Sequence, residues 1–269
     1  MKYAHFHMES QDLNTLNQFF IIKKEIINDI IKAGELKKQD IVLEIGPGKG
    51  GLTRELAKHV KKVIAIEKDE SLKDSLTGLP ENIDLIFQDA KKYILKNPDS
   101  FNKIISSPPY NILEPLLHIM ISMDNIDLIV LAVPKYFLEN MEKNPIFSSF
   151  FEFKNIKEIK KEYFSPIPRI DSEIIKITKK KTETDKEYLI KSLYDMQDIK
   201  LKNALRSLFI EYNHERKNQP LTKKQAKELI NKLNIPKKIL EKNISSIPIP
   251  WFNKIPDMIL MYRTEVIEL

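Results

Sequence analysis

Short apolar runs alternate with stretches of helical spacing over the first 180 residues. Residues 24–34 place four isoleucines on one face of a helix, and Gly34 stands where that helix ends. Five apolar runs of strand length follow, over residues 41–46, 63–67, 83–87, 103–107 and 127–133. Runs of this length without polar alternation are typical of strands that are buried on both faces. Because helical stretches separate them, the pattern predicts an α/β fold with a doubly wound, Rossmann-like and mostly parallel sheet.

The pattern changes after residue 150. Residues 155–164 and 171–180 predict two strands joined by a proline-containing turn, and hence an antiparallel hairpin that finishes the sheet. From about residue 185 the spacing is helical, and helices are expected over 186–196, 199–212, 222–233 and 236–242. We therefore expect a first domain over residues 1–182 and a smaller helical domain over residues 183–269.

The composition narrows the class of protein. The 269 residues are 42% apolar, which is enough for a substantial core, and no run reaches the roughly 18 apolar residues of a membrane span. The first residues have neither the basic start nor the apolar stretch of a secretory signal. The chain has no cysteine, which excludes disulfides, thiolate metal sites and a cysteine nucleophile. We expect a cytoplasmic monomer with no metal and no membrane contact.

The charge is unevenly distributed along the chain. The net charge is +6, and residues 181–269 contribute +5 of it, with 17 basic against 12 acidic residues. Lysine-rich helical surfaces attract phosphate without reading bases, so the second domain is a candidate for RNA binding. The alternative is a set of solvated helix faces with no partner.

Glycines cluster at the end of the first predicted strand. Four of the six glycines in the chain lie within residues 46–51, where a strand ends and a helix begins. Glycine is required where φ is positive or where a ligand approaches the backbone, and a helix start offers free N–H groups. Gly46 and Gly48 therefore predict a nucleotide site. Glu44, before the first glycine, favours S-adenosylmethionine, while the pattern also fits NAD, with Glu67 ending the next strand.

A second motif, Ser107-Pro108-Pro109-Tyr110, follows the fourth predicted strand. The exocyclic amine of a base is a poor nucleophile because its lone pair is delocalised into the ring. A side-chain oxygen at Ser107 and the carbonyl of Pro108 can accept its two N–H groups, and Tyr110 can stack on the base. The prolines stiffen the loop. The alternative is a proline turn that only closes a buried strand.

Six segments together carry a resemblance to a known family. In chain order they are LNQFFI (16–21), EIGPGKGGLT (44–53), AIEKD (65–69), QDA (88–90), SPPY (107–110) and YFSPIPRIDS (163–172). They are similar to the motifs of the ribosomal RNA adenine N6-dimethyltransferases, which include the kasugamycin-resistance methyltransferase of bacteria and its archaeal and eukaryotic relatives. The likeness covers residues 13 to 180, with a weaker helical tail.

The resemblance implies S-adenosylmethionine as cofactor and assigns its contacts. Glu67, with Lys68 beside it, would hold the ribose hydroxyls. Asp89 would accept a hydrogen bond from the adenine amine, with Ala90 next to it.

The resemblance also implies roles for aromatic and apolar residues. Phe19 and Ile21 occupy cofactor-contacting positions of the N-terminal motif. Phe164 would stack on the target base from the side opposite Tyr110, although without the family it could equally be a core residue. The substrate implied is ribosomal RNA of the small subunit or of its assembly intermediate.

The departures from the family concern the target base. The family usually has Asn where this chain has Ser107, and Leu or Ile where it has Pro108. The SPPY segment is more similar to the motif of cytosine-N4 DNA methyltransferases. We expect adenine N6 as the target because the likeness covers the whole domain, with cytosine N4 as the alternative. A non-catalytic ribosome-assembly factor on the same scaffold is the alternative from another class.

Overall fold

The computed structural model describes residues 18–261. In its first part the elements are β1 (Phe20–Ile21), α1 (Lys24–Ala33), β2 (Ile41–Ile45), α2 (Gly51–Ala57), β3 (Lys62–Glu67), β4 (Ile83–Phe87), α3 (Ala90–Lys96), β5 (Lys103–Ser106), α4 (Leu113–Ile121), β6 (Leu128–Pro134) and α5 (Lys135–Lys143). They continue with α6 (Pro145–Phe150), β7 (Phe151–Ile159), β8 (Phe164–Ser165), β9 (Ser172–Lys179), α7 (Asp185–Asp195), α8 (Leu201–Lys217), α9 (Lys223–Lys232), α10 (Lys237–Leu240) and α11 (Trp251–Met261).

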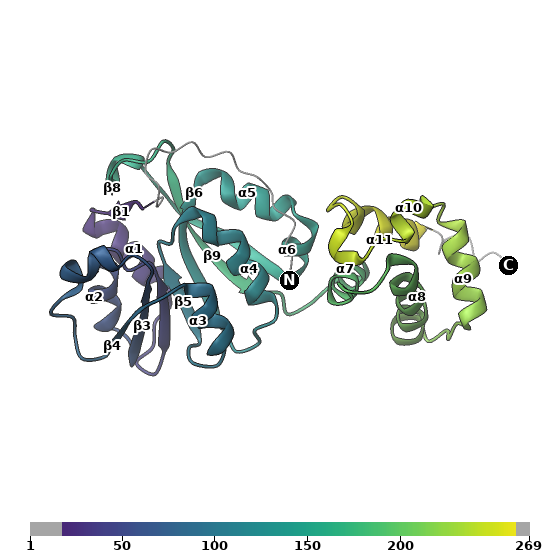
Figure 1. The fold of residues 1–269 in the computed structure, drawn as a ribbon, viewed down its shortest axis with the longest axis horizontal. Helices are drawn as coiled ribbons and strands as arrows, with labels where there is room; N and C mark the ends of the chain where they lie inside the picture. Colours follow the sequence, from purple (N-terminus) through teal and green to yellow (C-terminus); the bar gives the residue numbers. More distant parts are fainter. Residues whose placement is uncertain (1–17, 262–269) are drawn as a thin grey trace. The chain divides into compact units, whose positions relative to one another are not determined.

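Seven strands form one mixed sheet in the order β4-β3-β2-β5-β6-β9-β7 (Figure 1). The first five of these in the order pair in parallel, and β9 pairs antiparallel with both β6 and β7. The predicted doubly wound sheet with an antiparallel hairpin at its end is confirmed. The five apolar runs became β2 to β6, each within a residue or two of its predicted bounds.

Helices cover the sheet because its strands are apolar on both faces. Ile26 and Ile30 of α1 and Leu56 of α2 pack against Val42 and Val63 of the sheet in one buried cluster. Neighbouring strand residues such as Leu43 and Ile64 point to the opposite face, because side chains alternate along a strand. Helices α3 and α4, which contact one another, cover that face (Figure 1).

The hairpin differs in detail from its prediction. β7 begins at Phe151, earlier than expected, and already ends at Ile159. Residues beyond Lys160 form a short turn, and Phe164 and Ser165 pair antiparallel with Ile21 and Phe20 in a separate two-stranded sheet. The predicted first strand is therefore divided between two sheets.

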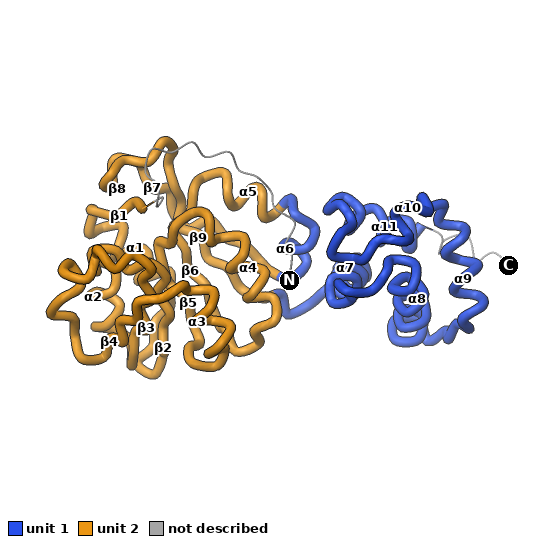
Figure 2. Tube along the Cα trace, viewed as in Figure 1, with its two compact units in different colours: residues 1–9, 143–150, 180–269 blue, residues 10–142, 151–179 orange. Residues whose placement is uncertain are grey.

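The described chain separates into two compact units (Figure 2). The sheet unit comprises residues 18–142 and 151–179, and the helical unit comprises residues 143–150 and 180–261. Helix α6 belongs to the helical unit because it contacts α7 and α11. A single domain boundary at residue 182, as expected from the sequence, leaves α6 in the first domain. The structure places this helix in the helical unit.

The helical unit has its own core and its own helix caps. Leu201, Leu205 and Leu208 of α8 are fully buried, at the spacing of three and four residues that keeps side chains on one helix face. Helices α7 and α9 each begin at a threonine, Thr184 and Thr222, with a reciprocal capping box.

Candidate active site

The two predicted motifs leave the sheet at neighbouring strands. β2 ends at Ile45, just before the glycine turn, and β5 ends at Ser106, just before Ser107. The two strands are hydrogen-bonded neighbours although β3 and β4 lie between them in the chain. The strand order reverses at this point, and open α/β sheets bind ligands in the crevice beyond the carboxyl ends of such strands. The topology therefore brings both motifs to one site.

The glycine turn needs its glycines. Gly46, Gly48 and Gly50 have φ values of 70°, 57° and 78°, a region that favours glycine over other residues. A Cβ atom added to Gly48 would lie 2.5 Å from the ring of Phe20. The Gly46 N–H donates to the carbonyl of Ile66 at 2.8 Å, which ties the turn to β3. The turn thus has a fixed backbone with little room for side chains.

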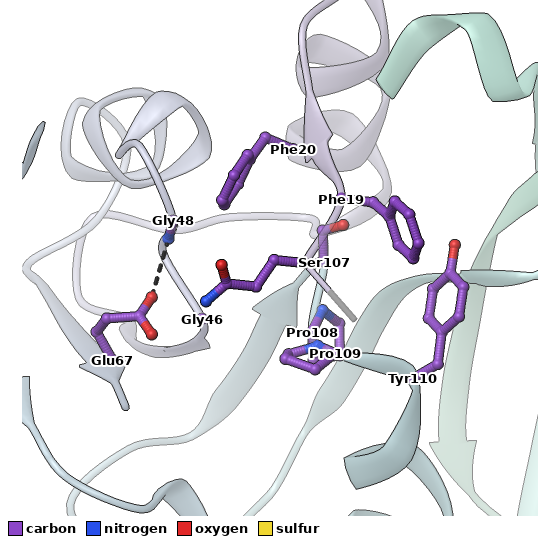
Figure 3. A pocket seen from close by; sticks show the side chains of 10 residues that line it. Phe19, Phe20, Gly46, Gly48, Glu67, Ser107, Pro108, Pro109 and Tyr110 are labelled. Atoms are coloured by element: carbon purple, nitrogen blue, oxygen red, sulfur yellow. Dashed lines mark hydrogen bonds between the residues drawn. The ribbon is translucent and has the colours of Figure 1, made fainter. Parts of the chain in front are cut away.

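Glu67 is held by backbone donors at the end of β3. Its Oε2 accepts from the Gly48 N–H at 3.2 Å, and its Oε1 accepts from the N–H groups of Lys68 and Asp69, both at 2.8 Å. The side chain is buried, with 4% of the residue exposed. A carboxylate has about four acceptor positions, so Oε2 can still accept a hydroxyl. Glu67 therefore both supports the glycine turn and lines the pocket (Figure 3).

Glu44 faces a cavity of about 180 Å³ that Ile21, Lys49 and Ser107 also line. Its Oε2 is buried and has no hydrogen-bond partner among the described residues. Burial, with the nearby Glu67 carboxylate as a smaller cause, raises the pKa of Glu44 to about 8. The nearby Thr53 hydroxyl lowers the pKa only in part, and its Oγ1 is likewise without a hydrogen-bond partner within residues 18–261. The cavity thus contains an acid that can still accept a hydrogen bond or pair with a cation.

The Ser107–Tyr110 turn forms the other end of the pocket. Ser107, Pro108 and Tyr110 line a cavity of about 30 Å³ together with Gly46, Gly48 and Glu67. The Tyr110 hydroxyl and the Ser172 Oγ are 3.0 Å apart and hydrogen-bonded, which fixes the position of the ring. The predicted residues of both motifs are therefore brought into one pocket (Figure 3).

The segment before and within β1 forms a third wall of this pocket. The Phe19 ring lies against Tyr110 with 5.6 Å between ring centroids, and Phe20 lies against Gly48. The Gln18 amide donates to Asp69 Oδ2 at 3.0 Å. Leu16 and Asn17, the first residues of the predicted N-terminal motif, lie outside the described residues.

Three residues that line the 30 Å³ cavity were not among those expected: Gln18, Phe20 and Pro109. Their signal in the sequence is their position inside the LNQFFI and SPPY segments.

The structure does not place Phe164 opposite Tyr110. Phe164 is 2% exposed and belongs to the core cluster under α1, and its backbone pairs with Ile21. The ring that faces Tyr110 is Phe19 (Figure 3). Phe164 is therefore a core residue whose backbone pairs with the N-terminal segment. This is the alternative role that the sequence left open for it.

Lys68, Asp89 and Ala90 lie beside the pocket and line neither cavity. Lys68 is exposed and Ala90 is buried. Asp89 caps α3, since its Oδ1 accepts from the Lys92 N–H at 3.1 Å. Its second oxygen, Oδ2, is not needed for this cap. The cofactor roles expected for these three residues stay predictions.

Within residues 18–261, His, Asp and Glu side chains do not form any group of three that could hold a metal ion. Over the same residues, every helix is too short or too polar to cross a bilayer.

A glycine turn and the Ser107–Tyr110 turn meet at the switch point of a doubly wound sheet, an arrangement typical of methyltransferases that depend on S-adenosylmethionine. The family model of ribosomal RNA adenine dimethylase matches residues 11–244. This chain therefore belongs to that family, and S-adenosylmethionine is its methyl donor. The predicted family and cofactor are confirmed, and the NAD alternative is not.

Two of the similar curated proteins are named as probable small-subunit ribosomal RNA methyltransferases. The chain is 34% identical over 219 residues to a "Probable ribosomal RNA small subunit methyltransferase A" of Methanococcus maripaludis strain C6, with 74% of this chain and 81% of that protein covered. A protein of the same name from Methanopyrus kandleri is 29% identical and covers 81% of this chain, with 82% of its own length matched.

Two solved structures share the fold over nearly the whole chain. A dimethyladenosine transferase of Plasmodium falciparum superposes with a TM-score of 0.58 and 24% identity, covering 91% of this chain and 98% of that chain. The 23S rRNA methyltransferase ErmE gives a TM-score of 0.55 and 19% identity, covering 89% of this chain and 98% of that chain. These likenesses show the fold.

Proposed function

We propose that this protein dimethylates N6 of adenine in ribosomal RNA of the small subunit. The observation that carries the proposal is the family match over residues 11–244 combined with the Ser107–Tyr110 turn at the switch point of the sheet. The description of the family and the names of the similar proteins support adenine N6 over the cytosine N4 alternative.

The residues at the glycine end suit S-adenosylmethionine. The positive-φ glycines leave the backbone of the turn open to a ligand, and Glu67 retains acceptor capacity for the ribose hydroxyls. The orphaned Oε2 of Glu44 suits a cationic group, and the cofactor carries an ammonium and a sulfonium. When bound, S-adenosylmethionine supplies a methyl group that its sulfonium activates.

The residues at the serine end would prepare the target amine. The Ser107 Oγ and the Pro108 carbonyl would accept its two N–H groups, which makes the nitrogen pyramidal and frees its lone pair. Tyr110, oriented by Ser172, would stack on the base. A side-chain base is not required, because the amine can lose its proton after it has been methylated. Positioning and electrostatics would supply most of the acceleration.

The target base has to be unpaired or turned out of its helix before it reaches Ser107. An amine inside a base stack cannot approach a pocket at the edge of the sheet. Unpaired bases of structured RNA meet this requirement at the lowest cost.

We also propose that the helical unit contributes RNA affinity through phosphate contacts. Lys223, Lys224 and Lys227 of α9 and Lys237 and Lys238 of α10 are exposed, on helices adjacent in the chain. Lysines attract phosphates without reading bases, so this surface would add affinity and salt dependence, not base choice.

Neutralising three of these lysines tests their role. Lys223→Gln, Lys224→Gln and Lys227→Gln together should weaken RNA binding and reduce the slope of log K against log salt by about 2 to 3, since each phosphate contact contributes about 0.7–0.9. A matched triple variant at Lys37, Lys38 and Lys61, exposed before β2 and β3, should leave the slope unchanged. An equal slope in both triple variants would refute the RNA role of α9.

Methyl transfer to purified small-subunit RNA tests the proposed function directly. The protein would be incubated with labelled S-adenosylmethionine and with unmodified RNA or subunits, and the nucleosides would be separated by mass spectrometry. N6,N6-dimethyladenosine is expected. Label in N4-methylcytidine would establish the alternative base, and RNA binding without transfer would establish a non-catalytic assembly factor. A monomeric state and a cytoplasmic location stay predictions from the sequence.

A further inference from the structure

One arginine of α2 bridges the glycine turn and the segment that follows β3. The Arg54 Nη1 donates to the backbone carbonyls of Lys49 and Gly50, at 3.1 and 3.2 Å. Its Nη2 donates to the backbone carbonyls of Ser75 and Thr77, at 3.4 and 3.0 Å. A guanidinium carries its donors in a rigid planar fork, so this side chain holds the two stretches of backbone at a set separation.

Gly50 leaves the space that this arginine occupies. Gly50 has a φ of 78°, and a Cβ atom added there would lie 2.2 Å from the Arg54 Nη1. The same Cβ would lie 3.1 Å from the Cδ2 atom of Leu76, a buried residue of the second segment. The glycine therefore allows both the left-handed backbone of the turn and the position of the guanidinium.

The bridged segment, residues 69–77, is also joined to the glycine turn at its first residue. The Asp69 N–H donates to Glu67 Oε1 at 2.8 Å. Glu67 Oε2 accepts from the Gly48 N–H at 3.2 Å, which is the bond drawn in Figure 3. Glu67 therefore connects the turn to the start of the 69–77 segment, and Arg54 connects the same two pieces near the end of that segment.

The 69–77 segment depends on this second connection. Residues Glu70–Leu76 form a 3₁₀-helix, whose hydrogen-bond geometry is poorer than that of an α-helix, and most side chains of the segment are exposed. Segments with exposed backbone bonds and few buried side chains open locally at low cost. Because Arg54 donates two bonds near the end of the segment, it limits this opening.

We propose that Arg54 is a positioning residue for S-adenosylmethionine, which keeps Gly48 and Glu67 at the separation that the cofactor requires. Arg54 lines neither cavity of the site, so it acts through the turn and the 69–77 segment and does not touch the cofactor. Groups that are held before a ligand binds lose less free energy to ordering. The inference rests on the proposed cofactor role of Glu67, and it is the same for an adenine or a cytosine target.

Calorimetry with S-adenosylmethionine on the whole protein, without RNA, tests the bridge. Arg54→Ala removes all four bonds and should raise the dissociation constant about 3- to 30-fold, the range for residues that act on a ligand without touching it. In methyl transfer at saturating cofactor, kcat should stay within about twofold of wild type, because only uniform binding is lost. Arg54→Lys, whose single ammonium cannot reach both pairs of carbonyls, should give an intermediate dissociation constant.

Two further positions separate the bridge from a simple loss of charge. Lys58, at the end of the same helix, is exposed and pairs with Glu55 at 2.7 Å. Lys58→Ala removes one positive charge, as Arg54→Ala does, and should leave the dissociation constant unchanged. Gly50→Ala would displace the guanidinium. It should raise the dissociation constant by a smaller factor in the Arg54→Ala background than in wild type, since the bridge is then already lost.

Amide hydrogen exchange in the cofactor-free protein follows the positioned groups themselves. The Gly48 and Asp69 amides, which donate to Glu67, should exchange faster in Arg54→Ala and at the wild-type rate in Lys58→Ala. The melting temperature of each variant shows that it is folded. A general loss of stability would lower the melting temperature without selecting these two amides.

The possible outcomes separate the two proposals. If Arg54→Ala binds S-adenosylmethionine as wild type does, or if Lys58→Ala weakens binding equally, the role of Arg54 is overturned. Unchanged exchange of the Gly48 and Asp69 amides in Arg54→Ala would overturn it as well. If Glu67→Gln binds as tightly as wild type, the cofactor role of Glu67 fails, and this inference fails with it. A loss of affinity in Glu67→Gln but not in Arg54→Ala overturns this inference alone.

Discussion

The two ends of the pocket are constructed by different means. At the glycine end, three positive-φ glycines and three backbone N–H bonds to Glu67 hold the turn and this carboxylate in place. At the serine end, Ser107 follows the last residue of a strand, and the two rings beside it are positioned by one hydroxyl bond and by ring contact. More backbone contacts therefore hold the first end than the second.

This difference suits the two ligands. The cofactor is the same molecule in every turnover. A site whose groups are already in place when it binds avoids much of the free-energy cost of ordering them. A base that arrives within a large RNA has to enter from outside the pocket, at the end that fewer backbone contacts hold. Mutations at the two ends should therefore change different measured quantities, and the following predictions begin with the largest expected effect.

Ser107→Ala should lower the rate of methyl transfer by about 10²- to 10³-fold, because one well-placed polar group that acts in the transition state is lost. The dissociation constant for S-adenosylmethionine should barely change. Single-turnover rates and calorimetry would measure the two quantities. Ser107→Asn restores the residue usual in the family and should retain activity on adenine. Full activity of Ser107→Ala would remove the serine oxygen from the mechanism.

Glu67→Gln should raise the dissociation constant for the cofactor by about 10- to 100-fold, the loss expected for a charged acceptor. One carboxylate oxygen becomes an NH₂ group, which cannot accept from the backbone N–H groups that now surround it. The melting temperature should also fall. Glu70→Gln, an exposed neighbour, is the control. Unchanged affinity in a folded Glu67→Gln variant would contradict the cofactor assignment.

Cofactor binding should depend on the protonation of Glu44. With its pKa raised to about 8, Glu44 is mostly neutral at pH 7, and a bound cation would favour the ionised form. Affinity for S-adenosylmethionine should therefore increase about tenfold between pH 6 and pH 8 and level off above pH 8. Glu67 and Lys49 are the other charged groups near this carboxyl or its cavity.

Glu44→Gln separates this effect from other titrations. The pH dependence should flatten in the variant, and calorimetry in buffers of different ionisation enthalpy should no longer detect proton release. Without cofactor, the free energy of unfolding should change with pH in the opposite direction to the cofactor affinity. The folded wild type keeps a proton that the unfolded chain releases above its pKa of 4.5, so its stability falls as the pH rises from 4.5 towards 8. The same pH profile in both proteins would rule out Glu44.

Asp89→Asn should produce the smallest change. Asparagine caps helices as well as aspartate does, so the stability should change by less than about 0.5 kcal/mol. If Oδ2 contacts the cofactor, the dissociation constant should rise about two- to tenfold, the range for a weakened hydrogen bond. A cofactor affinity equal to that of wild type would reduce Asp89 to its capping role.

The sequence predicted the sheet well because its strands carry continuous apolar runs, a strong local signal. The sequence did not predict α11. Pro256 lies inside this helix, and a proline in a helix interior normally ends the helix. The sequence also misplaced the ring of Phe164, whose burial depends on pairing with Ile21, more than 140 residues away. The motifs identified the two turns that meet at the switch point, whereas the direction of each side chain depends on packing between distant segments.

Helix α6 has a consequence for the modular history of this fold. Its segment, residues 143–150, leaves the sheet unit after α5, packs with α7 and α11, and returns directly into β7. The helical unit is therefore not a terminal appendage that one cut removes, because a chain ended near residue 182 would expose Ile146 and Phe147, which are now buried. An exchange of this unit between relatives would have to transplant two separate pieces of the gene at once.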